Sequence, residues 1–130
     1  MDAEDIREIF RSLGPVHIRL MFGGQGVYQG EVMFALEAYG ELFLKADDES
    51  VAFFRELGSR PFGFETKDGS RTLTSYWLMP ESAIDDPDEA AELAGKALAA
   101  ARRAKASQAR KGGRTASGRK ARKQPAEPAT

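Results

Sequence analysis

The chain of 130 residues contains no cysteine and a single histidine, His17. Without cysteine it can form no disulfide, offer no thiolate nucleophile and ligate no metal through sulfur. A hydrolase triad would have to use the one histidine. The composition therefore excludes disulfide-stapled folds and cysteine-ligated metals, and it is compatible with a reducing compartment.

Long apolar runs are also absent, since no segment approaches the roughly 18 apolar residues that a membrane-spanning helix needs. The first residues, MDAEDIREIF, are acidic and amphipathic, without the basic start and apolar stretch of a signal peptide. Because 42% of the residues are hydrophobic, the chain can build one modest core. We expect a soluble cytoplasmic protein of one domain with no membrane contact.

Acidic residues are nearly missing from the last part of the chain, although the net charge is only −1. Residues 1–100 hold nine Lys and Arg against 19 Asp and Glu, a net charge of −10. Residues 101–130 hold ten cations against one acid, Glu127, a net charge of +9. The sequence thus joins an acidic body to a basic tail.

Apolar spacings of three and four residues predict three helices. The first begins after Asp2, the second after Asp47 or Asp48, and the third after Asp86, each aspartate acting as N-cap. The third helix has the strongest start signal and should run to about residue 105. Its buried stripe is predicted to be Ala90, Leu93, Ala94, Ala97, Leu98 and Ala101.

Alternating apolar residues predict strands between these helices. The run VHIRLMF, residues 16–22, is followed by apolar runs interrupted at residues 29–30 and 38–40, and a later pair flanks Asp68-Gly69, a strong hairpin signal. We therefore predict an α+β fold with an antiparallel sheet covered by helices, in the order helix, three strands, helix, two strands, helix.

The glycines Gly23, Gly24 and Gly26 raise the question of a phosphate-binding loop. A dinucleotide fingerprint must open a helix, whose N-terminus supplies the amide donors, and a P-loop needs a Lys-Ser or Lys-Thr pair. This stretch opens instead onto the strand-like VYQGEVMF. We interpret the three glycines as a structural turn or bulge between strands and predict no cofactor.

Other chemistry has little support in the sequence. His17 lies on the polar face of a predicted strand, where a solvated side chain is the ordinary outcome. Asp47, Asp48 and Glu49 could hold a divalent cation weakly, but a capped helix start accounts for them better. No acid, base and nucleophile set converges, so we predict neither an enzyme nor a metal site.

The segment after residue 105 has no large apolar residue, so residues 106–130 are predicted to be a disordered tail beside a domain of residues 1–105. Cations in and before this tail would contact DNA or RNA phosphates without reading sequence, although no aromatic residue is interleaved to stack on bases. The alternatives are a solubilising tail and a tail that folds back on the acidic body. The candidate nucleic-acid contacts are Arg102, Arg103, Lys105, Arg110, Lys111, Arg114, Arg119, Lys120, Arg122 and Lys123.

Three stretches together resemble the N-terminal domain of the TfoX/Sxy family of competence regulators. They are RLMFGGQGVYQGEVMFALEAYGELFLKAD, PFGFE and SYWLMPESAIDDPDEAAELAGKALAAARR, and the likeness covers roughly residues 5–103. The resemblance implies a secretion-chaperone-like α+β fold and action as a transcriptional coactivator alongside a cyclic-AMP receptor protein. Family members that activate competence carry a helical C-terminal domain, where this chain has the basic tail.

Two functions follow as hypotheses. The first is a non-enzymatic bacterial regulator or adaptor, whose domain contacts a protein partner, either the transcription machinery or a regulator, and whose tail contacts DNA without sequence specificity. The second is a chaperone-like interaction module that forms a homodimer through its sheet and has no nucleic-acid role. An enzyme is the third and least supported alternative.

Overall fold

The computed structural model describes residues 1–21 and 23–115, with side chains as far as Gln108 apart from that of Phe64. Within these residues, six strands form one antiparallel sheet in the order β1-β2-β3-β4-β6-β5. The elements are α1 (Ala3–Ile9), β1 (His17–Met21), β2 (Gly24–Gln29), β3 (Val32–Ala38), β4 (Glu41–Lys45), α2 (Val51–Glu56), β5 (Pro61–Thr66), β6 (Gly69–Leu78), α3 (Glu81–Ile84) and α4 (Pro87–Thr115).

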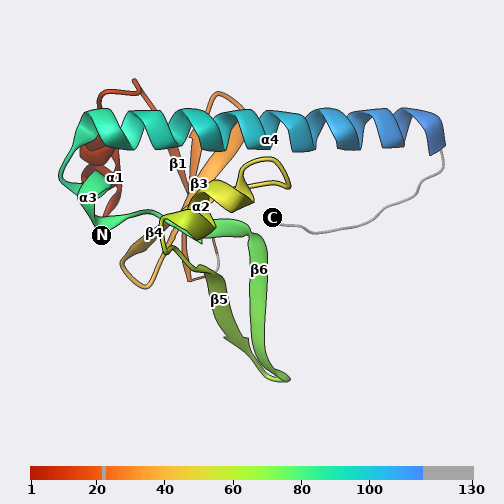
Figure 1. Cartoon of the computed structure of the whole chain (residues 1–130), viewed down its shortest axis with the longest axis horizontal. Helices are drawn as coiled ribbons and strands as arrows, with labels where there is room; N and C mark the ends of the chain where they lie inside the picture. The colour runs from red at the N-terminus through yellow and green to blue at the C-terminus, as the bar shows by residue number, and fades with distance from the viewer. Residues whose placement is uncertain (22, 116–130) are drawn as a thin grey trace.

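Helix α4 lies across one face of the sheet, over β3 and β4, with α1 packed beside its first turns (Figure 1). Its N-cap is Asp86, whose Oδ1 accepts hydrogen bonds from the main-chain N–H groups of Asp88 and Glu89 at 3.1 and 3.2 Å. All six residues of the predicted stripe are buried. Because four of them are alanines, the helix can approach the sheet closely.

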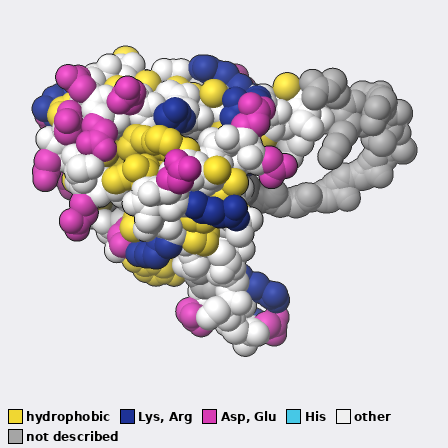
Figure 2. Space-filling model, in the orientation of Figure 1, with side chains coloured by type: hydrophobic (Ala, Val, Ile, Leu, Met, Phe, Trp, Pro, Cys, Tyr) yellow, Lys and Arg dark blue, Asp and Glu magenta, His cyan; other side chains and the backbone are white. Residues whose placement is uncertain are grey.

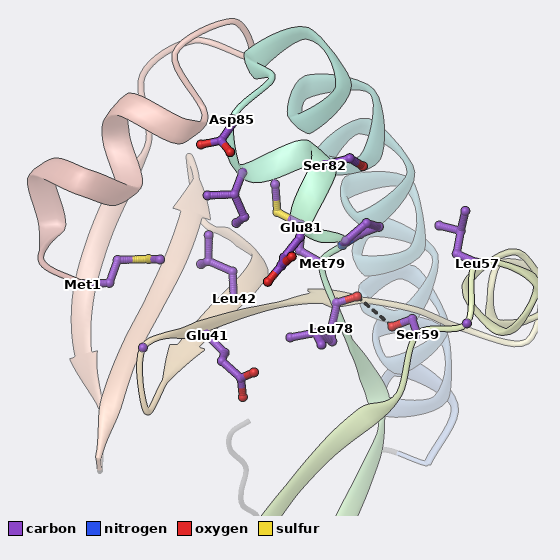
Figure 3. A pocket seen from close by; sticks show the side chains of 14 residues that line it. Met1, Glu41, Leu42, Leu57, Ser59, Leu78, Met79, Glu81, Ser82 and Asp85 are labelled. Carbon is purple, nitrogen blue, oxygen red and sulfur yellow. Dashed lines mark hydrogen bonds between the residues drawn. The ribbon is translucent and has the colours of Figure 1, made fainter.

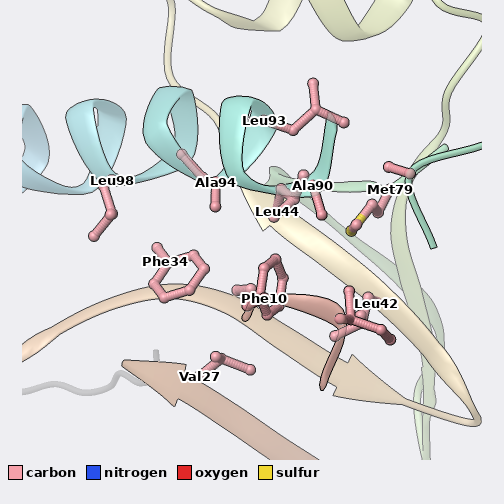
Figure 4. Close-up of a cluster of buried hydrophobic side chains, with 14 of the residues drawn as sticks. Phe10, Val27, Phe34, Leu42, Leu44, Met79, Ala90, Leu93, Ala94 and Leu98 are labelled. Atoms are coloured by element: carbon pink, nitrogen blue, oxygen red, sulfur yellow. The ribbon is translucent and has the colours of Figure 1, made fainter. Parts of the chain in front are cut away.

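The main core fills the space between α4 and the sheet (Figure 4). Phe10 of the α1 C-cap and Phe34 of β3 are both fully buried and meet edge to face, with ring centroids 5.3 Å apart. Leu42 and Leu44 of β4 point into the same cluster. Burying each of these side chains contributes roughly 1.5–3 kcal/mol, so this layer is the main source of stability.

A smaller cluster lies on the opposite face of the sheet. It contains Leu36, Ala38, Phe43 and Tyr76, and Phe62 at the start of the β5–β6 hairpin packs its ring 4.9 Å from that of Phe43. Beyond this contact the hairpin projects away from the body (Figure 1). The sheet is therefore apolar on both faces near β4 and β6, although α4 covers only one.

The predicted α+β class with an antiparallel sheet is confirmed, but the order of elements differs in two places. Four strands precede α2, because the interruptions at residues 29–30 and 38–40 are both full turns: Gly30, Tyr39 and Gly40 have φ values of 60°, 56° and 81°. Helix α3 was not predicted, since a single turn of four residues is too short to display a helical period.

Helix α4 is also longer than predicted, ending at Thr115 instead of about residue 105. The first six added residues, ASQARK, include Ala, Gln, Arg and Lys, which have high helix propensity and can extend an existing helix without burying a stripe, whereas propensity does not explain the helix at Gly112 and Gly113. Residues 116–130, for which the sequence predicts disorder, lie outside the described residues. The domain boundary at residue 105 stays a prediction.

Candidate functional site

Two surfaces have features of binding sites, and they lie toward opposite ends of α4 (Figures 1 and 3). One is the basic end of α4, residues 102–115, which continues past the edge of the sheet. It carries six of the ten cations proposed to contact nucleic acid: Arg102, Arg103, Lys105, Arg110, Lys111 and Arg114. The other four, Arg119, Lys120, Arg122 and Lys123, lie outside the described residues.

Arg103 is held by the acidic turn that precedes α2. Its guanidinium donates from Nε to Asp47 Oδ2 at 2.6 Å and from a terminal nitrogen to Asp47 Oδ1 at 2.9 Å, and Glu49 Oε2 lies 3.1 Å from Nε. The hydrogen bonds from Arg103 lower the pKa of Asp47 to about 2, against a smaller opposing effect of burial. The turn therefore anchors α4 to the body and neutralises this cation.

The two neighbouring cations differ in their surroundings. Arg102 donates to the side-chain oxygen of Gln29 at 2.9 Å, a neutral partner at the end of β2. Lys105 is exposed and forms no ion pair with any residue that the structure describes. Arg102 and Lys105 are therefore available to bind an external anion, whereas Arg103 is already paired with the carboxylate of Asp47.

The second surface is an open groove of about 930 Å³ between the end of α2, the start of β4 and helix α3 (Figure 3). Leu42 and Met79 form its buried floor, and Ile84 is partly buried beside them. Leu57 and Met1, at its borders, are 48% and 39% exposed. Figure 2 shows apolar side chains reaching the surface on this face of the molecule, with both acidic and basic side chains around them.

Hydrogen bonds between neighbouring segments fix the walls of the groove. The Ser59 hydroxyl donates to the Leu78 carbonyl at 2.7 Å, and the Leu78 N–H donates to the Arg60 carbonyl at 2.8 Å. The Met79 N–H donates to the Leu42 carbonyl at 2.9 Å. Because β6 is tied to both β4 and the start of β5, the groove is preformed by the backbone.

Acidic side chains surround the groove, and no lysine or arginine is among the residues that line it. Glu41 is paired with Arg60 through two hydrogen bonds of 2.9 and 2.8 Å. Glu81 and Asp85 of the α3 region are exposed and have no ion-pair partner in the described part of the chain. The groove therefore combines an apolar floor with a rim on which two of the three carboxylates, those of Glu81 and Asp85, have no ion-pair partner among the described residues.

Groups suited to catalysis or metal binding are not gathered at either surface. His17 is exposed on β1 and does not line the groove. Among residues 1–21 and 23–115, no three His, Asp or Glu side chains converge as a metal site would require. In the same residues no helix combines the length and hydropathy needed to cross a bilayer.

The three predicted turn glycines lie where β1 gives way to β2. Gly23 has a φ of 73°, so it supplies the turn. Gly24 and Gly26 are within β2 itself. A Cβ on Gly24 would overlap the main-chain carbonyl oxygen of Glu37, and one on Gly26 would lie 2.9 Å from Met21 Sδ. The stretch therefore leads into strand β2 and not into a helix.

The groove was not predicted from the sequence. The pairing of Arg103 with Asp47 and Glu49, which we call the clasp, was not predicted either. Both join residues far apart in the chain, such as Asp47 with Arg103 and Leu42 with Met79. The only signal in the sequence was the opposite charge of the body and the tail.

Comparison with known proteins assigns a family to most of the folded residues. The profile of the TfoX N-terminal domain matches residues 8–101. DNA transformation protein TfoX1 of Aliivibrio fischeri (strain ATCC 700601 / ES114) is 33% identical over 66 residues, which are 51% of this chain and 32% of that protein. The chain thus covers about a third of the length of this relative.

Proposed function

The chain belongs to the TfoX N-terminal domain family, and we propose that it is a non-enzymatic regulatory adaptor that joins a protein partner to DNA. The name of its relative in Aliivibrio fischeri connects the family to DNA transformation, which supports a role in regulating DNA uptake. The proposal assigns binding, not catalysis, to both surfaces. DNA contact is assigned to the basic end of α4.

The observation that carries this proposal is the extension of α4 beyond the sheet. Arg102 and Arg103 still contact the body, and beyond them the helix continues from Lys105 to Thr115, a length of about 15 Å. Six cations fall in residues 102–115, and no acidic residue does. A projecting basic helix of this kind suits sequence-independent contact with phosphates.

Binding of the full-length protein to a fluorescent duplex of random sequence tests the proposal. If five phosphates are neutralised, log K should fall against log salt with a slope of about −4.5. Replacing Lys105, Arg110, Lys111 and Arg114 together by glutamine should weaken binding and make the slope shallower. A control, Lys67→Gln with Arg71→Gln, removes two of the cations of the β5–β6 hairpin and should leave affinity unchanged.

If the α4 variant and the unaltered protein bind DNA equally well, the basic end of α4 does not contact DNA. Loss of binding in the hairpin control alone would move the DNA contact to the hairpin.

A specific observation also favours the alternative function, a module that forms a homodimer through its sheet. In the described residues β1 pairs only with β2, so its outer edge is open, and Leu20 on this strand is 87% exposed. Sedimentation of the protein and of Leu20→Lys over a range of concentrations tests this alternative. A dimer that Leu20→Lys dissociates, together with an absence of DNA binding, would favour it over the adaptor.

A further inference from the structure

We propose that the acidic groove beside α3 is the docking site for a basic amphipathic segment of a partner protein. The proposal rests on the adaptor function above, and it adds where the partner binds and what chemistry the bound segment has. The segment would place leucine-like side chains on the groove floor and lysine or arginine side chains against the rim.

The apolar part of this assignment comes from the floor and borders of the groove. Leu42 and Met79 are 1% and 3% exposed, so they provide a packed base, while Leu57 leaves 48% of its surface in water. Leu57 is the C-cap residue just after α2 and, unlike Phe54 within the helix, is not covered by the core. An apolar side chain that enters the groove would cover Leu57 and gain about 25 cal/mol for each Å² that it buries.

The charge of the rim selects the polar part of the segment. Arg60 already satisfies Glu41, but Glu81 and Asp85 face solvent without an ion-pair partner among the described residues. An acidic peptide would meet three carboxylates and no lysine or arginine on the groove lining. Charge complementarity therefore favours a cationic segment and disfavours an anionic one.

The chain's own basic residues do not meet both requirements. Beyond residue 105, the side chains that are not polar or charged are only Ala and Pro, so this segment has the charge but lacks leucine-sized anchors. A partner segment with Leu, Met or Phe at helical spacing has both features. The apolar floor thus distinguishes a partner from the protein's own C-terminal residues.

A synthetic amphipathic helix of leucine and lysine is a suitable probe, with fluorescence anisotropy of the labelled peptide as the measurement. The full-length protein should bind it more tightly than either of two control peptides. The first control has the same composition in an order without helical amphipathicity, and the second has glutamate in place of lysine.

Two groove variants and one matched control then locate the binding site. Glu81→Lys with Asp85→Lys reverses the rim and should weaken peptide binding by about tenfold. Leu57→Gln alters only an exposed side chain and should weaken it by about fivefold. Glu31→Lys, on the exposed turn between β2 and β3 at the far side of the sheet, makes the same type of charge change and should have no effect. Circular dichroism checks that each variant remains folded.

The outcomes separate this proposal from the function on which it rests. If the groove variants lose the peptide but still bind duplex DNA, both stand. If the peptide binds all variants equally, or binds no better than its scrambled control, the groove assignment is wrong even where DNA binding persists. If truncation after Thr115 raises peptide affinity by tenfold or more, the C-terminal residues occupy the groove and the partner assignment is overturned. Loss of DNA binding alone would overturn only the role of α4.

Discussion

Replacing Gly24 by alanine should destabilise the fold through a collision between two main chains. The added Cβ would overlap the carbonyl oxygen of Glu37 on the neighbouring strand β3 and approach Ala38 Cα to 3.4 Å. The obstacle is backbone, so a rotamer change cannot relieve it. Strands β2 and β3 would have to separate locally, where Gly24 pairs with Ala38.

The size of the loss in unfolding free energy depends on the contacts that hold β3 in place beside Gly24. Glu37 is only 7% exposed, and its carboxylate accepts hydrogen bonds from Gln25 Nε2 and from the Gly40 N–H, both at 2.9 Å. Overpacking by one methyl costs roughly 1–3 kcal/mol, and strain on each of these two bonds adds up to about 1 kcal/mol. Alanine also lowers the conformational entropy of the unfolded chain, which offsets about 0.4–1 kcal/mol of this destabilisation. We expect a net loss of about 2–3 kcal/mol.

Urea unfolding followed by circular dichroism measures this loss, with Gly23→Ala as the matched control. Gly23 has a φ of 73° but no described atom within 4 Å of an added Cβ, so its substitution should cost only about 1 kcal/mol of backbone strain. Gly24→Ala should therefore be the more damaging of two identical changes at adjacent positions. A Gly24→Ala protein as stable as the unaltered one, or more stable than Gly23→Ala by any margin, would refute the reasoning.

Three further predictions concern the core, a helix cap and the clasp. Phe34→Ala should lower the free energy of unfolding by about 3–5 kcal/mol in urea titrations, because it opens a cavity against Phe10. Asp86→Ala should cost about 1 kcal/mol and lower the melting temperature, since two N–H groups of α4 lose their acceptor. The lowered pKa of Asp47 means that its pairing with Arg103 stabilises the fold above about pH 3.8 and that this contribution is lost as pH falls toward 2. Arg103→Gln should reduce that acid dependence of stability and raise the pKa of Asp47 in an NMR titration; unchanged values would show that the ion pair does not form in solution.

Features encoded by neighbouring residues could be predicted from the sequence. The N-cap at Asp2, the N-cap at Asp86 and the hairpin at Asp68-Gly69 each depend on residues within three or four positions, and all three are present in the structure. The alanine-rich stripe of α4 was equally readable, because helical periodicity records which face is buried. Local chemistry was sufficient for most of the elements.

Leu57 shows where local pattern fails. Its spacing of three residues from Phe54 is that of one helical face, yet it is 48% exposed, because α2 ends at Glu56 and the chain turns away at Gly58, with a φ of 76°. The apolar spacing in the sequence extends past the end of the helix, so periodicity alone does not show where the helix ends. The groove depends on this exposed leucine, and for that reason the sequence did not reveal it.

The clasp at Arg103 also limits which cations of α4 can contribute to DNA binding. Its guanidinium is already bonded to Asp47 and lies near Glu49, so binding a phosphate would exchange one set of anionic acceptors for another. Such an exchange gains little free energy and adds little to the salt dependence, because the cation is already neutralised. Lys105, which has no ion pair among the described residues, would release counterions when it binds. Among the three cations at positions 102, 103 and 105, Arg103 therefore anchors α4 to the body, whereas Arg102, which has only the neutral partner Gln29, and Lys105 remain available to bind phosphates.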